Sequence, residues 1–416
     1  MDHVHSPWIN MTPNDEKKSA GMLPAFRAYL GLNRNVAVLA VSTLGLALGE
    51  ELWLTFLPKY LVALGATGLG VGLFSSFKDF LDGVYQYPGG WVTDRFGRKK
   101  ALMVFTLLAI TGYGLASVAP GWGYMFPALA LIMAWKSGAF PTSFAVIGDA
   151  LPQGRRGIAF SVQSIMQRFP RVIGAPLGGL LIGALGVLAG IKTALWVTLV
   201  LGLGVLATQG WKYVEPSGSL AKSKPESLLG TFNSLPRTLR RLLLVECFVR
   251  TGEAIAAAFI ILYVIDVHGI SIEIYGLLYA IQQTVAILFY VPSGKLADRT
   301  GRRPIIAATF LFFALFPLAV YLAGTIPLLI GAFVVGGLKE FGEPARKSYI
   351  VDQVDPTRRG RAVGAYYTVR NLIIIPGGIL GGVLWGISPN LPLVVGCSVG
   401  AIGAAAFLVL GKGEYR

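Results

Sequence analysis

Long apolar stretches alternate with short polar ones along most of this chain. A helix of about 20 apolar residues crosses the hydrocarbon core of a bilayer, and stretches of about that length recur after residue 35. We expect about twelve spans, near residues 36–61, 69–92, 101–119, 123–147, 158–185, 188–209, 240–266, 274–297, 304–324, 327–351, 361–387 and 391–411. The pattern therefore predicts an all-α membrane protein.

Basic residues gather in every second loop between these spans. The basic loops carry Arg95, Arg98, Lys99, Lys100, Arg155, Arg156, Arg299, Arg302, Arg303, Arg358, Arg359 and Arg361, whereas the alternate loops have almost no lysine or arginine. Because loops rich in these residues stay on the cytoplasmic side, we expect both termini in the cytoplasm. The polar residues 1–34 lack the pattern of a cleavable signal peptide, so the first span is expected to act as an uncleaved signal-anchor.

The longest polar stretch inside the chain runs from Gln209 to Leu239 and divides the spans six and six. Its proline, serine, glycine and lysine residues are typical of a solvated linker. We therefore predict a cytoplasmic N-terminal tail, a six-helix bundle, a cytoplasmic linker, a second six-helix bundle and a cytoplasmic C-terminal tail, at residues 1–35, 36–209, 210–239, 240–411 and 412–416.

The two predicted bundles repeat one another. A shift of about 203 residues places Glu50 on Glu253 and Lys136 on Lys339. The same shift aligns Gly49, Phe56, Tyr60, Pro141, Asp149, Arg155, Arg156 and Gly157 with Gly252, Phe259, Tyr263, Pro344, Asp352, Arg358, Arg359 and Gly360. Agreement at so many charged, glycine and proline positions indicates two pseudo-symmetric halves built from one unit.

A signature loop stands at matching places in both halves. Gly90-Trp-Val-Thr-Asp94-Arg95-Phe-Gly97-Arg98-Lys99-Lys100 resembles the loop G-x-x-x-D-R-x-G-R-K/R-K/R of the major facilitator superfamily, and Gly294-Lys-Leu-Ala-Asp298-Arg299-Thr-Gly301-Arg302-Arg303 repeats it. The resemblance implies a secondary transporter that works as a monomer and whose loops latch the halves in the outward-facing state. The alternative is that these charges only anchor the loops to lipid head groups.

The resemblance also implies where a substrate binds. The superfamily is itself the standard example of two parallel halves related by an axis along the membrane normal, with the substrate site at their interface. A second motif, Gly174-Ala-Pro176-Leu-Gly178-Gly179, is similar to the antiporter motif G-P-x-x-G-G, although its proline is one place late. Close helix packing by small residues is the alternative reading of that motif.

Composition supports a membrane location and excludes several classes of function. The chain is 54% hydrophobic and only 14% charged, whereas soluble domains carry about 25% charged residues. The net charge of +15 lies in short loops rather than in aromatic-rich basic patches, which argues against nucleic-acid binding. Neither a P-loop nor a nucleophile or metal motif is present, and Cys247 and Cys397 lie inside spans, so we expect no ATP hydrolysis, enzyme activity, metal or cofactor.

Many ionisable residues nevertheless fall inside the predicted spans. Each costs at least about 2.5 kcal/mol at the bilayer centre and usually faces a partner or a water-filled cavity. The candidate cavity residues are Glu50, Glu51, Lys78, Asp79, Asp82, Lys136, Arg168, Arg171, Glu246, Arg250, Glu253, Lys339, Glu343 and Arg370. Several share a helix face by their spacing of three or four residues. They either line the cavity or form ion pairs that brace the bundle.

Four of these residues form a repeat-symmetric set: Glu50, Lys136, Glu253 and Lys339. Glu50 or Glu253 is the predicted proton site if transport is proton-coupled, and the lysines are expected to bind an anionic group of the substrate. We therefore expect the protein to bind a small polar or charged organic solute and protons. The compact loops indicate that the surrounding lipid bilayer is a prokaryotic inner membrane. A facilitated-diffusion uniporter and a non-transporting receptor or scaffold are the alternatives.

Overall fold

The computed structural model describes residues 34–138, 156–214, 228–354 and 359–410, and every regular element in these ranges is a helix. The first half contains α2 (Arg34–Glu51), α3 (Leu57–Ala63), α4 (Gly68–Phe96), α5 (Arg98–Ser117), α6 (Met125–Met133), α8 (Arg156–Leu185) and α9 (Val187–Lys212). The second half contains α10 (Leu228–Asn233), α11 (Arg237–Leu262), α12 (Ile272–Thr300), α13 (Arg302–Leu322), α14 (Ile326–Leu338), α15 (Glu343–Asp352), α16 (Arg359–Ile387) and α17 (Leu391–Leu410).

The helices have the length and apolar character of membrane spans. Eight helical stretches in the described ranges are long and apolar enough to cross a bilayer. The helix α4 is also long, at 29 residues, but carries Lys78, Asp79 and Asp82 in its middle. The all-helical membrane fold expected from the sequence is confirmed, and the structure agrees with about twelve spans in two bundles.

Some predicted spans are interrupted. The span predicted at 327–351 is two helices, because α14 ends at Leu338 and α15 begins at Glu343. Pro344 lies in the first turn of α15, where its missing N–H and its effect on the preceding residue favour a helix start. The first span is likewise divided, by a short 3-10 turn, η1 (Leu54–Phe56).

Other boundaries also differ from the expectation. The span predicted at 123–147 begins as the 3-10 turn η2 (Trp122–Tyr124), continues as α6 and ends its described part in a π-helical turn, η3 (Ala134–Gly138), while residues 139–147 lie outside the described ranges. Helix also enters the predicted linker, because α9 extends to Lys212 and α10 lies within it.

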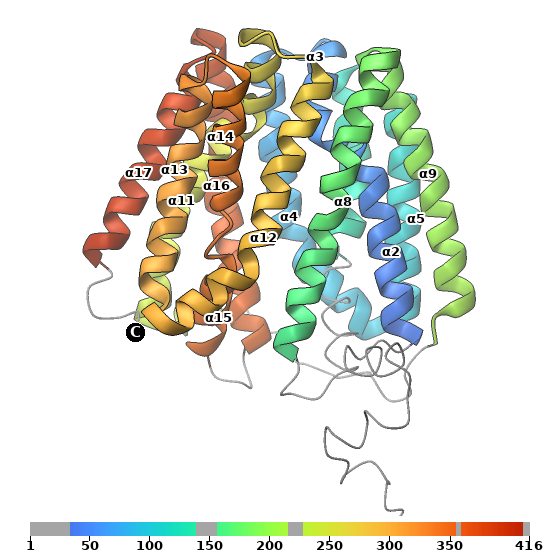
Figure 1. Ribbon diagram of the computed structural model, residues 1–416. Coiled ribbons are helices and arrows are strands. Elements are labelled where there is room, and N and C mark those ends of the chain that lie inside the picture. Colours follow the sequence, from blue (N-terminus) through green and yellow to red (C-terminus); the bar gives the residue numbers. More distant parts are fainter. Residues whose placement is uncertain (1–33, 139–155, 215–227, 355–358, 411–416) are drawn as a thin grey trace, which may run out of the picture.

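The basic loops lie at one end of the bundle, which we call the basic end. The helix α2 begins there and α17 ends there, together with α15, as Figure 1 shows. The opposite end, called the far end, carries α3. At the basic end, α5 and α13 are each preceded by a glycine with φ +85°, Gly97 and Gly301. Only glycine adopts this backbone conformation readily, so the repeated loop is repeated in geometry as well as in sequence.

The two halves meet along two seams, α4 against α16 and α8 against α12. Small residues bring the backbones close together in the first turns of α4 and α12, near the far end. A Cβ atom on Gly72 would lie 2.3 Å from the carbonyl oxygen of Gly378, and one on Gly276 would lie 2.6 Å from that of Ala175. Such approach is typical of helix interfaces built from small residues, and it holds the far end of both seams shut.

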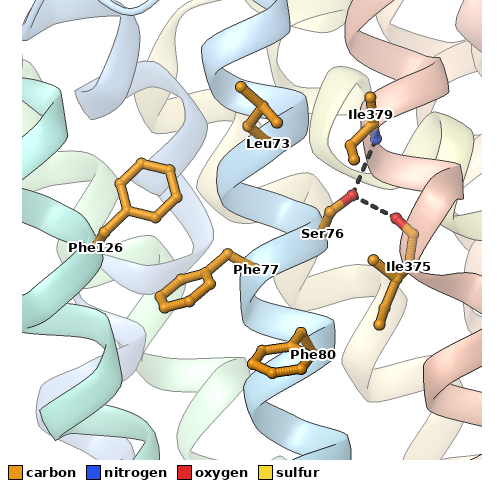
Figure 2. Close-up of a pocket in the computed structure, with 7 residues that line it drawn as sticks. All are labelled: Leu73, Ser76, Phe77, Phe80, Phe126, Ile375 and Ile379. Atoms are coloured by element: carbon orange, nitrogen blue, oxygen red, sulfur yellow. Dashed lines mark hydrogen bonds between the residues drawn. The ribbon is translucent and has the colours of Figure 1, made fainter.

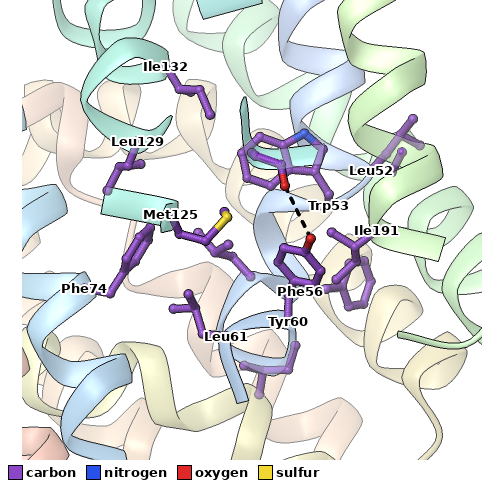
Figure 3. Packing of buried hydrophobic residues seen from close by; sticks show 14 of the residues in the cluster. Leu52, Trp53, Phe56, Tyr60, Leu61, Phe74, Met125, Leu129, Ile132 and Ile191 are labelled. Carbon is purple, nitrogen blue, oxygen red and sulfur yellow. Dashed lines mark hydrogen bonds between the residues drawn. The ribbon is translucent and has the colours of Figure 1, made fainter. Parts of the chain in front are cut away.

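A large apolar cluster fills the same end of the molecule. Figure 3 shows Trp53, Phe56 and Tyr60 packed together at the end of the chain's first span, with the Tyr60 hydroxyl donating to the carbonyl of Ala116. The ring of Phe56 also meets that of Tyr275 in the other half, with centroids 6.1 Å apart. Close packing between the halves thus continues from the seams into the core of the far end.

Candidate functional site

Ionisable side chains occupy the middle of the helices, and we call them the central charged layer. They are the fourteen candidate residues of the sequence together with Glu340 and Arg346. The layer contains contacts within each half and contacts that cross between the halves. The repeat-related residues Glu50 and Glu253 differ most in their surroundings.

Glu253 of α11 is held by two cations. Lys339 Nζ lies 2.7 Å from its Oε1, and Arg250 Nη1 lies 2.6 Å from its Oε2. The ammonium of Lys339 also lies 5.4 Å from the ring centres of Phe313 and Phe316. Both charges of this repeat-equivalent pair are therefore already satisfied.

Glu50 of α2 has a different environment. Its side chain is only 5% exposed, and its Oε1 accepts a hydrogen bond from the Tyr113 hydroxyl at 2.6 Å. Within the described residues it forms no ion pair. Lys136, in the turn η3, lies within electrostatic reach of Glu50 but forms no hydrogen bond or ion pair with any described residue. Glu50 and Lys136, the equivalent pair in the first half, therefore make no ion pair with each other or with any other described residue.

Glu51, the neighbour of Glu50, is fully engaged. Its Oε1 pairs with Arg171 Nε of α8 at 3.1 Å, and its Oε2 accepts from the Thr55 hydroxyl at 3.1 Å. This pair joins the first span to α8 inside one half. It braces that half, whereas Glu50 beside it has no ion pair with any described residue.

Glu246 of α11 lies in a cage of three arginines. Its Oε1 lies 2.9 Å from Arg370 Nη1, 3.6 Å from Arg346 Nη1 and 3.8 Å from Arg250 Nε, and the Tyr366 hydroxyl donates to its Oε2 at 2.6 Å. The side chain is 0% exposed. Glu246, Arg250 and Arg370, which the sequence placed among the candidate cavity residues, here hold α11, α15 and α16 together.

Arg168 crosses from one half to the other. Its Nη2 lies 2.7 Å from Glu343 and 3.1 Å from Glu340 at the break between α14 and α15. The Tyr290 hydroxyl also hydrogen-bonds Glu343, and Lys347 lies 2.6 Å from its other oxygen. Because Arg168 is on α8 and both acids are in the second half, this contact must break if the halves move apart.

A weaker contact crosses the other seam. Asp82 of α4 accepts hydrogen bonds from Ser137 of η3 and, at 3.5 Å, from the amide of Asn371 on α16. Within the described residues Asp82 has no ion pair, whereas its neighbours Lys78 and Asp79 pair at 3.3 Å. Arg168 and Asn371 are related by the 203-residue repeat, but their partners Glu343 and Asp82 are not.

Sequence reasoning missed the tyrosines of the layer. Tyr113, Tyr290 and Tyr366 each donate a hydrogen bond to a carboxylate of the layer. Tyr366 stands four residues before Arg370, so its position on the charged face of α16 was available as a signal. Tyr113 gives no such signal, because none of the fourteen candidate residues lies on α5 beside it.

The predicted latch lies at the basic end. Gly90, Arg95, Gly294 and Arg299 fall in the last turns of α4 and α12, while the side chains of Asp94 and Asp298 lie outside the described part. Arg302 pairs with Asp352 of the same half at 2.7 Å, and Lys99 donates to the carbonyl of Gly210. Arg98 is 9% exposed, at the start of α5. The latching role of these residues stays a prediction.

An apolar pocket lies in the described region. It has a volume of about 340 Å³ and is lined by Leu73, Ser76, Phe77, Phe80, Phe126, Ile375 and Ile379. Figure 2 shows that it lies beside the α4–α16 seam, where the Ser76 hydroxyl donates to the carbonyl of Ile375 and accepts from the amide of Ile379. No ionisable side chain lines it, so it is separate from the charged layer. The cavity predicted between the halves stays a prediction.

Known proteins resemble the chain over nearly its full length. The sequence pattern of the Major Facilitator Superfamily matches residues 39–247 and 242–415. An uncharacterised MFS-type transporter of Methanocaldococcus jannaschii is 22% identical over 91% of this chain and 95% of its own. A multi-drug resistance efflux pump PmrA homolog of Lactococcus lactis is 24% identical over 88% and 92%. The crystal structure of a nucleoside transporter has the same fold, with a TM-score of 0.77 at 14% identity over 91% of this chain and 100% of its own.

Proposed function

Since this chain belongs to the major facilitator superfamily, we propose that it is a secondary transporter that moves a small polar or charged organic solute by alternating access and couples this to protons. The observation that carries the proposal is the contact of Arg168 in one half with Glu340 and Glu343 in the other. Charges that meet across a seam are made and broken when one half rocks against the other. A charged layer of this kind favours a polar solute over a purely apolar one.

The structure supports an inward-open or occluded state for this arrangement. Gly72 and Gly276 close the far end of both seams, and the far end is the side with few basic loops. With the basic end in the cytoplasm, the closed side is outside the cell. Both termini are then cytoplasmic, and the archaeal and bacterial sources of the relatives support a prokaryotic plasma membrane.

Glu50 is the proposed proton site. Burial without a counter-ion is costly for a carboxylate, and such a group takes up a proton rather than carry its charge unpaired. Glu50 accepts a hydrogen bond from Tyr113 and lies in the field of Lys136, Arg171 and Glu51, but has no ion pair with any described residue, whereas Glu253 is held by two cations. Of the two carboxylates that the repeat makes equivalent, Glu50 is thus the one free to exchange its proton.

Flux measurements in proteoliposomes test this function. Solutes selected by a thermal-shift screen of metabolites are loaded, and solute and proton movement are recorded together. We expect wild-type protein to couple the two, and Glu50→Gln to keep solute exchange but lose proton movement. Glu253→Gln is the repeat-matched control and should lose stability instead.

The outcomes separate the alternatives. Solute flux without proton movement in the wild type would make the protein a uniporter. If no screened solute is transported, a non-transporting receptor or scaffold is the function that remains. Unchanged proton coupling in Glu50→Gln would refute the assignment of the proton site while keeping the transport function.

A further inference from the structure

The two lysines that the repeat makes equivalent are in opposite states, and we propose that the open one, Lys136, binds the carboxylate of an organic acid as substrate. This inference rests on the proposed transport function and names its substrate class. It further implies that the proton and the acid move together, in the same direction.

The second-half lysine is unavailable to a ligand. Lys339 already holds Glu253 at 2.7 Å and stands over the rings of Phe313 and Phe316. Glu253 in turn is fixed by Arg250. A substrate anion at Lys339 would have to displace the Glu253 carboxylate from a contact of 2.7 Å and leave it with Arg250 alone.

None of the three N–H donors of the Lys136 ammonium forms a hydrogen bond with a described residue. The neighbouring acids are occupied elsewhere: Glu51 binds Arg171 and Thr55, and Glu50 accepts from Tyr113. Ser137, the next residue, is turned to Asp82. The turn that carries Lys136 is π-helical, a distortion that is frequent at functional sites.

The charges around Lys136 decide what kind of ligand fits. The groups that act on it are Glu50 and Glu51 of α2, Arg171 of α8 and Lys78 of α4. Glu51 is already neutralised by Arg171, and Lys78 by Asp79. A carboxylate supplies both the opposite charge and the acceptor oxygens that an ammonium needs, whereas an amide supplies only a weaker acceptor.

Glu50 links acid binding to the proton. While Glu50 is ionised, its negative charge attracts Lys136 and repels an incoming carboxylate. When Glu50 takes up a proton, that repulsion disappears, and Lys136 loses a negative neighbour that an incoming carboxylate then replaces. Each ligand therefore strengthens binding of the other, and this coupling is reciprocal by linkage. Because the proton and the acid bind together, they are also taken up or released together, which is symport rather than antiport.

Matched acid–amide pairs test the proposal on the purified full-length protein in detergent. The probes are acetate and acetamide, succinate and succinamide, and benzoate and benzamide, read as shifts of the thermal unfolding midpoint with concentration. We expect at least one acid to stabilise the wild type more than its amide, more strongly near pH 6 than near pH 8. In Lys136→Gln the half-saturating concentration of that acid should rise at least about tenfold, as expected for loss of a charge-assisted bond.

Three variants guard against trivial loss of folding. Lys136→Arg should restore the preference for the acid, and Lys339→Gln should keep it even though the protein unfolds at a lower temperature. Glu50→Gln should make the preference independent of pH. Equal shifts by every acid and its amide in the wild type, or an undiminished preference in Lys136→Gln, would overturn the proposal. Solute flux in proteoliposomes would still stand in that case, so failure here is distinct from failure of the transport function.

Discussion

Removing the charge of Glu246 should destabilise the protein without touching the proposed substrate site. Glu246→Gln keeps the shape of the side chain and an acceptor for Tyr366. It leaves Arg370 and Arg346, 2.9 Å and 3.6 Å from Glu246, without their carboxylate, while Arg250 retains Glu253. The substitution therefore isolates how much the negative charge of Glu246 contributes to the free energy of unfolding through these two arginines.

The magnitude follows from the geometry. A pair of charges about 4 Å apart is worth about 4 kcal/mol at an effective dielectric constant of about 20. Relief of the desolvation of Glu246 offsets a large part of the summed attraction. Breaking a buried pair by removing one partner typically costs about 3–5 kcal/mol, which for a chain of 416 residues corresponds to a fall of roughly 3–6 °C in the unfolding midpoint.

Thermal unfolding in detergent measures this cost. Asp352→Asn is the control, because Asp352 pairs with Arg302 at 2.7 Å but its side chain is 53% exposed. Such exposed pairs contribute less than about 1 kcal/mol. The double variant Glu246→Gln/Arg370→Gln should recover at least half of the loss, since it removes one stranded cation.

A midpoint of Glu246→Gln within about 2 °C of the wild type would refute this reasoning. It would mean that the cage of arginines is compensated in another way. Glu246 would then return to the set of residues that bind the substrate or a proton.

Two further predictions concern the seams between the halves. Gly72→Val would place a Cβ atom 2.3 Å from the Gly378 carbonyl oxygen, so the far end cannot close and the initial transport rate should fall at least about tenfold while the fold is unchanged. The control Gly331→Val, with open space around it, should transport normally. A wild-type rate in Gly72→Val would contradict the closure. Arg168→Gln should destabilise the state seen here by removing contacts of 2.7 and 3.1 Å, and it should make the far end more accessible to a cysteine-reactive probe. Adding Glu340→Gln should partly reverse this gain in accessibility. Equal accessibility in wild type and variant would show that the Arg168 contact does not favour one arrangement of the halves.

The asymmetry between the halves gives these residues different meanings. In the second half, acids and bases neutralise one another around Glu246 and Glu253. In the first half, Glu50 and Lys136 form no such pair with any residue in the described ranges. The first half therefore carries the groups that we propose to exchange ligands.

The sequence by itself determined the membrane architecture and its repeat. Apolar stretches of bilayer length, loops that are alternately rich and poor in lysine and arginine, and a 203-residue shift are local or periodic signals that can be read from the chain itself. The glycines at 97 and 301 were equally readable, because the positive φ that both adopt is accessible to little else.

Only the tertiary structure decided which charges pair. The sequence makes Glu50 and Glu253 equivalent, yet one meets Tyr113 and the other Lys339 and Arg250. Spacing along one helix shows which residues share a face, but an ion pair needs atoms within about 4 Å across helices whose rotation and tilt no local pattern encodes. Arg168 and Glu343 lie 175 residues apart in the chain and 2.7 Å apart in space, and packing of the whole bundle sets that distance.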